Sequence, residues 1–562
     1  MDPDTCTQEY NSATAFFAKI MISNNQSPTS SLTRRLTILT LLVGGVATCR
    51  AQAVSEAQRC SAALNWSTDV LLIDSAEVQP VGPVPGSTAT FPGRCRVRGQ
   101  IAPYVGTHGK RYSIGFELEL PYTWNGKLLF QGGGGLNGTV FPAIGPLTNR
   151  NSDAAPALAR GFAVVSMDSG HSGGDIAFAD DQQARANYAY AAIGQVTRVA
   201  KEFLHRFYSA GPAKTYFMGC STGGREAMIA AERYPAEFDG IVAGDPAFNL
   251  SDATLLSHNG ALEFAKIAPK DPNGLPILPQ ALTAPEWDLV RQSVLNACDA
   301  LDGARDGMIF NHRDCHFNPA VLECKAQQTS ACLSSEKVTA LQRAFAGPRD
   351  ASGKPIAGEW PFDAGIAEGG YLAWRIGSVG RDGKPGTPLV TLSDQTLTKF
   401  MNYPQIPSVA YQPIDYSLMQ RQIAPTAFMT DATSTDLTTF AARGGKMILV
   451  TGWSDPVFTP IDLTNWYERL TVESASTSAP ANTFARLFLV PGMNHCGGGP
   501  ALDNFDPLTA LTDWTENDKA PARIKATGKA FPGVSRPLCA YPKFAVYSGS
   551  GPTESEASYT CQ

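Results

Sequence analysis

A serine flanked by glycines, Ser221, lies where a short apolar run meets a helical pattern. The apolar run covers residues 215–218, and residues at helical spacing follow the serine as far as Tyr234-Pro235. A strand, a Gly-x-Ser-x-Gly turn and a helix together form the setting of a nucleophile elbow. The glycines let backbone approach the serine closely, and the N-terminus of a helix favours developing negative charge. The pattern therefore predicts Ser221 as the nucleophile of an acyl transfer.

A second Gly-x-Ser-x-Gly sequence surrounds Ser172, after a predicted strand at residues 162–167. No helical pattern follows it, because Gly173, Gly174 and Asp175 lead into a polar stretch. An elbow needs the helix as well as the strand. We therefore interpret Ser172 as a loop residue.

A serine hydroxyl is a weak nucleophile until a base removes its proton. Among the seven histidines, His495 is the one that follows a late predicted strand, at residues 486–490. The acid that orients the base is expected between serine and histidine in sequence, also at a strand end. Asp455 has this position, whereas the nearby Asp462 falls in a predicted helix. The spacing thus predicts Ser221, Asp455 and His495 as a catalytic triad.

Two cysteines adjoin the predicted triad, since Cys220 precedes the serine and Cys496 follows the histidine. If the serine and the histidine are in contact, these neighbours lie near disulfide distance. Ten of the twelve cysteines follow residue 53, an even number that is typical of five disulfides in an exported chain. The alternative is two unrelated buried cysteines.

Residues 1–53 have the pattern of a signal peptide: Arg34-Arg35, an apolar run at 36–47 and then Ala51-Gln52-Ala53. Matches to twin-arginine and lipoprotein signals are poorer, and Met21 is an alternative start. The net charge of −6 and the pI of about 5.7 suggest no nucleic-acid partner. We expect a secreted or periplasmic protein without stable membrane association, and the oligomeric state stays open.

Strands that alternate with helices predict the elements that must carry these residues. The predicted strands are 112–120, 127–130, 162–167, 215–218, 238–243, 446–451 and 486–490, and the predicted helices include 191–207 and 508–516. This order indicates an α/β class with a parallel, helix-covered sheet. Residues 54–250 and 434–562 carry the pattern. Between them, 251–433 is rich in Pro and Gly, has few strand patterns and is expected to be an inserted lid domain.

Two further stretches have residue types suited to chemistry. Four glycines, Gly132–Gly135, end the predicted strand at 127–130 and would expose peptide N–H groups for half of an oxyanion hole, the alternative being an ordinary turn. Asp299, Asp302 and Asp306 lie within eight residues next to glycines, which suits a hard cation. On spacing alone, a solvated acidic turn explains these aspartates equally well.

The chain resembles the tannase and feruloyl esterase family, which includes mono(2-hydroxyethyl) terephthalate hydrolases. The resemblance rests on Cys220-Ser221, Asp455 and His495-Cys496, and also on the stretches 443–446, 488–493 and 536–539. It implies an α/β-hydrolase fold with a large lid inserted after the sixth strand, and no organic cofactor. The oxyanion donors would be the N–H groups of Thr222 and Gly135.

The resemblance also implies a calcium site and a disulfide pairing. Calcium would bind the carboxylates of Asp299, Asp302 and Asp306 and the carbonyls of Ala304 and Met308. The implied pairs are Cys60–Cys95, Cys220–Cys496, Cys298–Cys315, Cys324–Cys332 and Cys539–Cys561.

The lid departs from the terephthalate hydrolases, in which a lid arginine pairs with the free carboxylate. The corresponding stretch, about 384–395, has no arginine, only Arg381 and Lys384 upstream, and a Trp-rich segment is shortened to 374–378. Four residues could wall an aromatic acyl group, the alternative being ordinary core: Phe248, Leu250, Phe400 and Phe458. The expected activity is hydrolysis of feruloyl- or galloyl-type esters. The alternatives are terephthalate monoester hydrolysis and a non-catalytic binding protein of the same fold.

Overall fold

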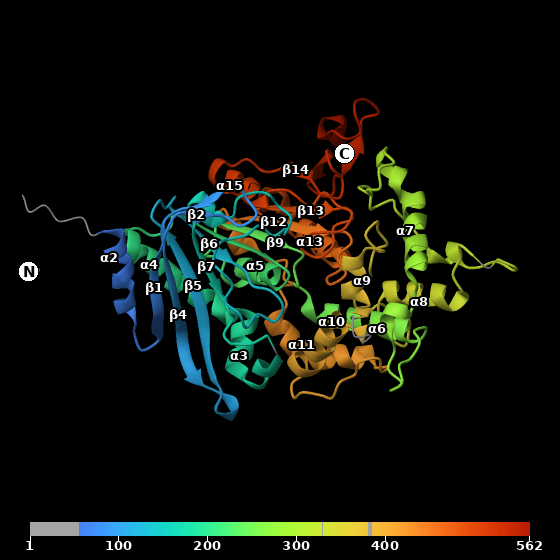
Figure 1. The fold of residues 1–562 in the computed structure, drawn as a ribbon, viewed down its shortest axis with the longest axis horizontal. Coiled ribbons are helices and arrows are strands. Elements are labelled where there is room, and N and C mark those ends of the chain that lie inside the picture. Colours follow the sequence, from blue (N-terminus) through green and yellow to red (C-terminus); the bar gives the residue numbers. More distant parts are fainter. Residues whose placement is uncertain (1–54, 175, 329, 380–384) are drawn as a thin grey trace, which may run out of the picture. The chain divides into compact units, whose positions relative to one another are not determined.

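The computed structural model describes residues 55–174, 176–328, 330–379 and 385–562 (Figure 1). The predicted signal peptide, Arg381 and Lys384 lie outside these ranges. Residues 54–562 form one compact unit. None of the described helices combines the length and apolar character needed to cross a membrane.

A nine-stranded mixed sheet forms the centre, in the order β1-β4-β5-β7-β6-β8-β9-β12-β13. In that order the strands are Leu71–Gln79, Arg94–Val105, Arg111–Pro121, Ala163–Met167, Lys127–Gln131, Lys214–Cys220, Gly240–Gly244, Lys446–Gly452 and Ala485–Val490. From β7 to β13 neighbouring strands are parallel, while β1, β4, β5 and β7 pair antiparallel. The predicted strands of this sheet agree with the observed ones to within two residues.

The expectation of a parallel sheet is wrong at one edge, where strands pair antiparallel. Two strands of this edge, β1 and β4, were not predicted from the sequence. On β4, Arg94, Arg96 and Arg98 alternate with buried residues and pair with Glu117 and Glu119 of β5, at 2.7–2.9 Å for the shortest contact of each arginine. Because arginines occupy alternate positions, β4 contains few apolar residues, and the alternation of apolar and polar residues that marks a strand was not recognised in the sequence.

Two hydrophobic cores cover the two faces of the sheet. On one face, α4 (Ala192–Tyr208), α5 (Thr222–Arg233) and α13 (Pro460–Ser474) pack against alternate strand residues such as Phe217. On the other face, α15 (Pro507–Asn517) packs against Tyr216 and Met218. Alternate residues of one buried strand therefore anchor both helix layers.

The described chain between β9 and β12 consists of helices joined by loops, with the two-residue strands β10 (Ser378–Val379) and β11 (Pro385–Gly386). Its helices are α6 (Leu250–Ala265), α7 (Ala284–Cys298), α8 (Ser335–Ala346), α9 (Gly369–Arg375), α10 (Pro388–Gln395), α11 (Tyr416–Thr430) and α12 (Thr438–Ala442). Apolar side chains of this segment, Trp287 and Leu341 among them, form a third core of their own. We call residues 251–433 the lid segment.

Five disulfides hold the described chain, and their pairing is the one that the family resemblance implies. They are Cys60–Cys95, Cys220–Cys496, Cys298–Cys315, Cys324–Cys332 and Cys539–Cys561. The remaining helices and strands flank the sheet or follow α15: α2 (Glu56–Ala62), α3 (Gln182–Ala186), α14 (Ala481–Phe484), β2 (Gly82–Pro83), β3 (Thr90–Phe91), β14 (Arg523–Thr527), β15 (Ser535–Cys539), β16 (Ala545–Tyr547) and β17 (Tyr559–Cys561).

Candidate active site

Ser221 occupies a sharp turn between β8 and α5, with φ 64° and ψ −126°. A positive φ is uncommon for a non-glycine residue and has to be held by its surroundings. Here the peptide groups are pinned to the next strand, since the N–H of Ser221 donates to the carbonyl of Gly244 at 3.0 Å. The carbonyl of Ser221 accepts from the N–H of Ala247, also at 3.0 Å.

Glycine is required on both sides of this turn because three backbone segments meet there. A Cβ on Gly219 would lie 2.6 Å from the carbonyl carbon of Gly223, and a Cβ on Gly223 would lie 2.6 Å from the carbonyl oxygen of Gly133. Buried Glu226 of α5 fastens the same glycine loop, because its carboxylate accepts the N–H of Gly133 at 2.8 Å and the side-chain amide of Asn137 at 2.6 Å. The loop at 132–135 is therefore packed directly on the elbow.

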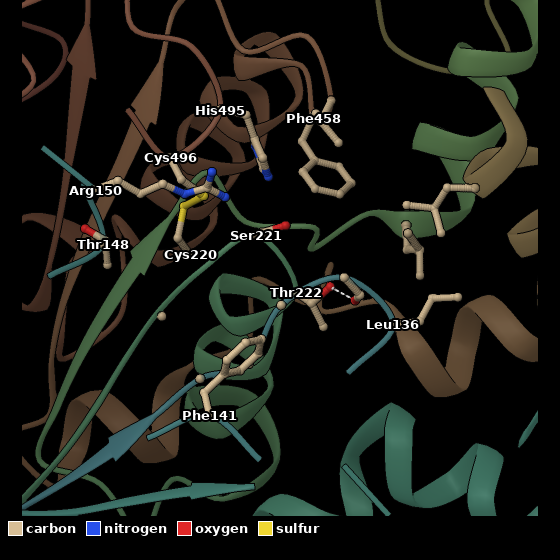
Figure 2. A pocket seen from close by; sticks show the side chains of 18 of the residues that line it. Leu136, Phe141, Thr148, Arg150, Cys220, Ser221, Thr222, Phe458, His495 and Cys496 are labelled. Atoms are coloured by element: carbon tan, nitrogen blue, oxygen red, sulfur yellow. Dashed lines mark hydrogen bonds between the residues drawn. A yellow bond between two sulfur atoms is a disulfide. The ribbon is translucent and has the colours of Figure 1, made fainter. Parts of the chain in front are cut away.

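Thr222 and Gly135, the predicted oxyanion residues, line the same pocket as Ser221. The hydroxyl of Thr222 donates to the carbonyl of Gly135, as Figure 2 shows. This bond joins the first turn of α5 to the glycine loop.

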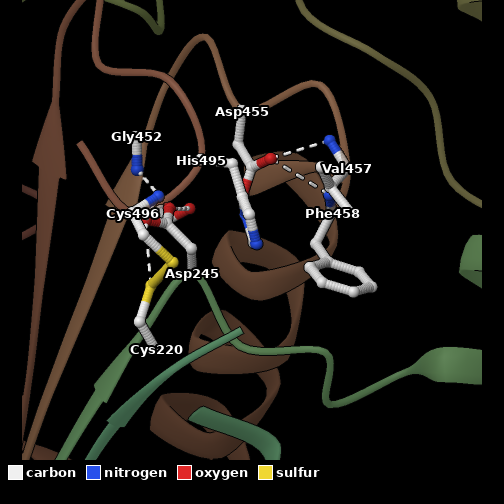
Figure 3. Close-up of a disulfide and its surroundings, with 9 residues drawn as sticks. Cys220, Asp245, Gly452, Asp455, Val457, Phe458, His495 and Cys496 are labelled. Atoms are coloured by element: carbon white, nitrogen blue, oxygen red, sulfur yellow. Dashed lines mark hydrogen bonds and ion pairs between the residues drawn. A yellow bond between two sulfur atoms is a disulfide. The ribbon is translucent and has the colours of Figure 1, made fainter. Parts of the chain in front are cut away.

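Asp455 and His495 follow the neighbouring parallel strands β12 and β13, whose last residues, Gly452 and Val490, are paired. Nδ1 of His495 lies 2.8 Å from Oδ2 of Asp455, and both side chains are buried (Figure 3). The other carboxylate oxygen accepts the N–H of Val457 at 2.7 Å. These bonds fix the carboxylate and, through it, the histidine ring. The histidine ring and Ser221 line the same pocket (Figure 2).

Charges around His495 determine its proton affinity. Burial lowers the pKa of the imidazole, but the charge and hydrogen bond of Asp455 and the charge of Asp245 raise it. The cation of Arg150 lowers it. The net result is a pKa above the usual histidine value.

Asp245, which the sequence did not single out, lies beneath this pair. Its Oδ1 accepts the N–H of Gly452 at 2.7 Å and its Oδ2 accepts the N–H of Cys496 at 2.8 Å (Figure 3). Burial and the charge of Asp455 raise the pKa of Asp245, and the charge of His495 opposes this shift. The signal for it was present, because Asp245 directly follows β9 at the edge of the sheet where the other site residues gather.

The Cys220–Cys496 bond, with a Cα–Cα distance of 6.1 Å, joins the residue before Ser221 to the residue after His495 (Figure 3). A third segment is attached at the same point, since the N–H of Arg150 donates to the carbonyl of Cys496 at 2.9 Å. The ends of β8 and β13 are thereby covalently linked beside the pocket.

The pocket has a volume of about 570 Å³ and mostly apolar walls. Leu250 and Phe458 line it, and the ring of Phe458 lies 5.5 Å from that of His495. Phe248 and Phe400 do not line it. Phe248 packs against Trp466 in the core under the sheet, and Phe400 packs against Phe178 and Tyr188.

Several wall residues were not predicted from sequence, because they come from loops and short helices without a motif. They are Leu136, Phe141, Ile144, Leu147, Trp374, Leu389 and Leu392. Arg150 also lines the pocket. Among the described lining residues, no other is a lysine, arginine, aspartate or glutamate. Ser172 is exposed in a loop and does not line this pocket, and Asp462 lies in α13.

The aspartates of the acidic loop in the lid segment, residues 299–308, accept hydrogen bonds from backbone N–H groups of residues 304–310. Asp299 accepts the N–H of Gly307 at 3.0 Å, and Asp302 accepts the N–H groups of Ala304 and Phe310 at 3.1 and 3.0 Å. Asp306 accepts the N–H of Met308 at 3.2 Å and forms an ion pair with Arg536. Burial raises the pKa of Asp302 to about 7, and the charges of Asp306 and Asp299 add to the rise.

This accumulation of buried negative charge, beside the carbonyls of Ala304 and Met308, fits a hard cation. The three lid aspartates are not close enough to one another to share an ion as they stand. Among the described residues, only two groups of three or more His, Cys, Asp or Glu residues have their ligand atoms within 4.8 Å of one another. They are Cys220, Asp245 and Cys496, and Asp245, Asp455 and His495. The first contains the disulfide, so its sulfurs are not thiolates. The lid aspartates would have to draw closer around an ion.

A sheet that is parallel from β7 to β13, with a serine elbow after β8 and further site residues at later strand ends, defines an α/β-hydrolase. The solved structure of feruloyl esterase B from Aspergillus oryzae has this fold, with a TM-score of 0.74 at 24% identity over 90% of this chain and 100% of that one. Tannin acyl hydrolase from Aspergillus niger gives a TM-score of 0.68 at 20% identity, over 91% and 96% of the two chains.

The chain belongs to the tannase and feruloyl esterase family, whose pattern matches residues 95–562. It is therefore a carboxylic ester hydrolase. It is 36% identical over 546 residues to mono(2-hydroxyethyl) terephthalate hydrolase of Piscinibacter sakaiensis, covering 88% of this chain and 89% of that protein. It is 27% identical over 500 residues to feruloyl esterase B of Aspergillus niger, covering 83% and 86%.

Proposed function

We propose that this protein is a secreted serine esterase that cleaves esters of aromatic acids through Ser221, His495 and Asp455. One observation carries the proposal. A buried, hydrogen-bonded Asp455–His495 pair faces the same apolar pocket as a serine held at positive φ between β8 and α5.

In this mechanism Nε2 of His495 removes the proton of the Ser221 hydroxyl, while its Nδ1–H donates to Asp455. The serine oxygen attacks the ester carbonyl, and the N–H groups of Thr222 and Gly135 stabilise the oxyanion. The protonated histidine then gives its proton to the departing alcohol. Water, activated by the same histidine, releases the acid from the acyl-enzyme.

The pocket supports an aromatic acyl group of the feruloyl or galloyl type. Its walls are aliphatic and aromatic, and the rings of Trp374 and Phe458 lie 6.2 and 5.5 Å from the histidine ring, measured between ring centres. Offset or edge contacts of this kind suit a planar ring. The similarity to a relative named feruloyl esterase B supports this choice.

A second candidate substrate is a terephthalate monoester. The 36% identity with mono(2-hydroxyethyl) terephthalate hydrolase favours it, and so does Arg150, a cation in the pocket that could pair with a substrate carboxylate. The lid arginine expected for that activity is absent from residues 385–395. We therefore place this substrate second.

Replacing Ser221 by alanine tests the mechanism. The variant should stay folded and lose esterase activity by several orders of magnitude, because the triad residues act as a unit. Ser172→Ala, the matched control, should keep the wild-type rate. On the wild type, kcat/KM should be higher for methyl ferulate or methyl gallate than for mono(2-hydroxyethyl) terephthalate. Normal turnover by Ser221→Ala would refute the mechanism, and the reverse order of substrates would favour the second candidate.

Three further assignments belong to the same proposal. Residues 1–53 act as a signal peptide, in keeping with five disulfides in the rest of the chain. Residues 251–433 form a lid domain, which supplies Trp374 and Leu392 to the pocket. The lid loop from Asp299 to Met308 holds a structural calcium ion.

A further inference from the structure

The stretch of the lid segment between α8 and α9 reaches the two loops that carry the catalytic pair. Its buried carboxylate, Asp363, uses one oxygen, Oδ2, to accept the hydroxyl of Ser454 at 2.7 Å and the N–H of Gly492 at 2.8 Å. Ser454 directly precedes Asp455, and Gly492 lies three residues before His495. One lid side chain thus bonds to both loops at once.

The lid backbone is seated tightly at this point. The N–H of Gly365 donates to the Ser454 hydroxyl at 3.0 Å, so this hydroxyl bridges the lid backbone and Asp363. A Cβ on Gly365 would lie 2.6 Å from Cβ of Ser454 and 3.0 Å from the carbonyl oxygen of Gly492. Contact this close leaves no room for the loops to shift toward the lid.

The arrangement has a counterpart on the sheet side. Asp245 also joins the two loops, through the N–H groups of Gly452 and Cys496. The acid loop and the base loop are therefore joined by two buried carboxylates, Asp245 at the end of β9 and Asp363 of the lid segment. Each of them accepts a hydrogen bond from the segment that carries Asp455 and another from the loop that carries His495.

Retaining Asp363 in this position is costly for folding. It is 2% exposed, and its second oxygen, Oδ1, has no hydrogen-bond partner among the described residues. A buried polar atom without a hydrogen-bond partner lowers the free energy of unfolding. Burial also raises the pKa of this carboxyl. The position nevertheless keeps an acceptor for the Ser454 hydroxyl and the Gly492 N–H, despite that cost.

We propose that Asp363 is a positioning residue for catalysis, which sets the spacing of the acid and base loops from the lid side. The proposal rests on the proposed function, since it assumes that Asp455 and His495 act as the acid and base pair. It makes the lid segment part of the support of the catalytic pair as well as a wall of the pocket.

Two substitutions at Asp363 separate positioning from stability. Asp363→Ala removes the acceptor for both loops, and we expect kcat to fall about tenfold to a hundredfold with KM within twofold, because a small displacement of a base costs rate without altering the pocket. Asp363→Asn keeps an oxygen for Ser454 and Gly492, and its NH2 group takes the place of the unpaired Oδ1. It should restore kcat to within about threefold of the wild type.

Asp181→Ala is the matched control. Asp181 is a buried carboxylate that accepts from the Tyr104 hydroxyl at 2.7 Å and from the N–H groups of Thr107 and Ala184 at 2.9 Å, away from the pocket. Its replacement should lower the Tm and leave kcat unchanged. The downfield proton resonance of the His495 Nδ1–H should be lost or shifted in Asp363→Ala and kept in Asp363→Asn.

The proposal is overturned if Asp363→Ala lowers only the Tm, or if Asp363→Asn is as slow as Asp363→Ala. Should Asp363→Ala fail to fold, Ser454→Ala decides, because it removes the shared hydroxyl and must lower kcat at constant KM. Failure of the proposed function has a different signature. In that case Ser221 of the wild type would not be labelled by phenylmethylsulfonyl fluoride, whatever residue occupies position 363.

Discussion

Four contributions meet at the imidazole of His495. Burial and the cation of Arg150 disfavour its protonated form, while Asp455 and Asp245 favour it. The carboxylates prevail, so the pKa is raised. A general base must be neutral to accept a proton, so activity should fall on acidification at a higher pH than for a histidine of ordinary pKa.

Replacing Arg150 by glutamine tests this balance. Arg150 lowers the pKa of His495, so its loss should raise that pKa further and move the acid limb of the kcat/KM profile to higher pH. The measurement is the pH dependence of kcat/KM on an uncharged ester such as methyl ferulate.

Arg206→Gln is the control for net charge. Arg206 pairs with Glu202 on the exposed face of α4, and its distant charge is screened by salt. It should leave the acid limb in place. A shift of the limb to lower pH in Arg150→Gln would contradict the assigned sign. The same variant should also lose any preference for a substrate that carries a carboxylate.

At the scale of elements, the site is assembled where β8, β9, β12 and β13 end. The Cys220–Cys496 bond joins the elbow after β8 to the histidine loop after β13, and Asp245 joins that loop to the end of β12. Ser221 directly follows β8 and His495 lies five residues after the end of β13, so a change in the position of one strand end is transmitted to the serine or to the histidine.

Removing this disulfide should affect rate as well as stability. The bond joins residues 276 apart, for which chain entropy gives a stabilisation of about 5 kcal/mol, an upper value because the unfolded chain keeps some structure. We expect Cys220→Ala/Cys496→Ala to have a lower Tm and also a lower kcat at temperatures where circular dichroism shows it folded.

Cys539→Ala/Cys561→Ala is the matched comparison, because it opens a bond between residues 22 apart that lies outside the pocket. Its chain-entropy contribution is about 3 kcal/mol. This variant should lose stability and keep its turnover while folded. Equal kcat in both double variants would show that the bond beside the serine serves stability alone.

At the scale of the whole molecule, the acidic loop connects the lid segment with the end of the chain. Asp306 pairs with Arg536 of β15, and a Cβ on Gly303 would lie 3.4 Å from Tyr547 of β16. An ion bound by this loop would therefore stabilise the contact between two distant parts of the sequence, and its loss should be visible in global unfolding.

Chelation tests the calcium proposal. Calcium at a hundredfold excess over its Kd would add about 2.7 kcal/mol to the free energy of unfolding, or roughly 3 °C of Tm for a chain of this size. We expect EGTA to lower the Tm by that order, and added calcium to restore it. Asp302→Ala should have a lower Tm that no longer responds to either reagent.

Asp350→Ala is the control, because Asp350 forms an exposed turn with Ser352 and Lys354. It should respond to EGTA as the wild type does. An unchanged Tm of the wild type after exhaustive chelation, with no calcium found by elemental analysis, would leave the loop as an acidic turn held by its own backbone.

Local patterns in the sequence determined much of this protein by themselves. The Gly-x-Ser-x-Gly turn, the apolar runs and the strand ends before Asp455 and His495 are properties of short stretches, so the sequence shows them directly. The disulfide pairing came from the family resemblance and agrees with the five observed bonds. Strand β4 was not predicted, because its arginines alternate with buried residues and the strand therefore contains no apolar run.

The tertiary structure alone decided what surrounds the reacting groups. Phe248 and Phe400 look like pocket residues by type and lie in the core, whereas Trp374 and Arg150 reach the pocket from segments without a motif. Asp363 is 91 residues before Ser454 and bonds to it across the lid interface. Such contacts depend on how whole layers pack, and a pattern of neighbouring residues carries no information about which distant side chain will fill the space beside it.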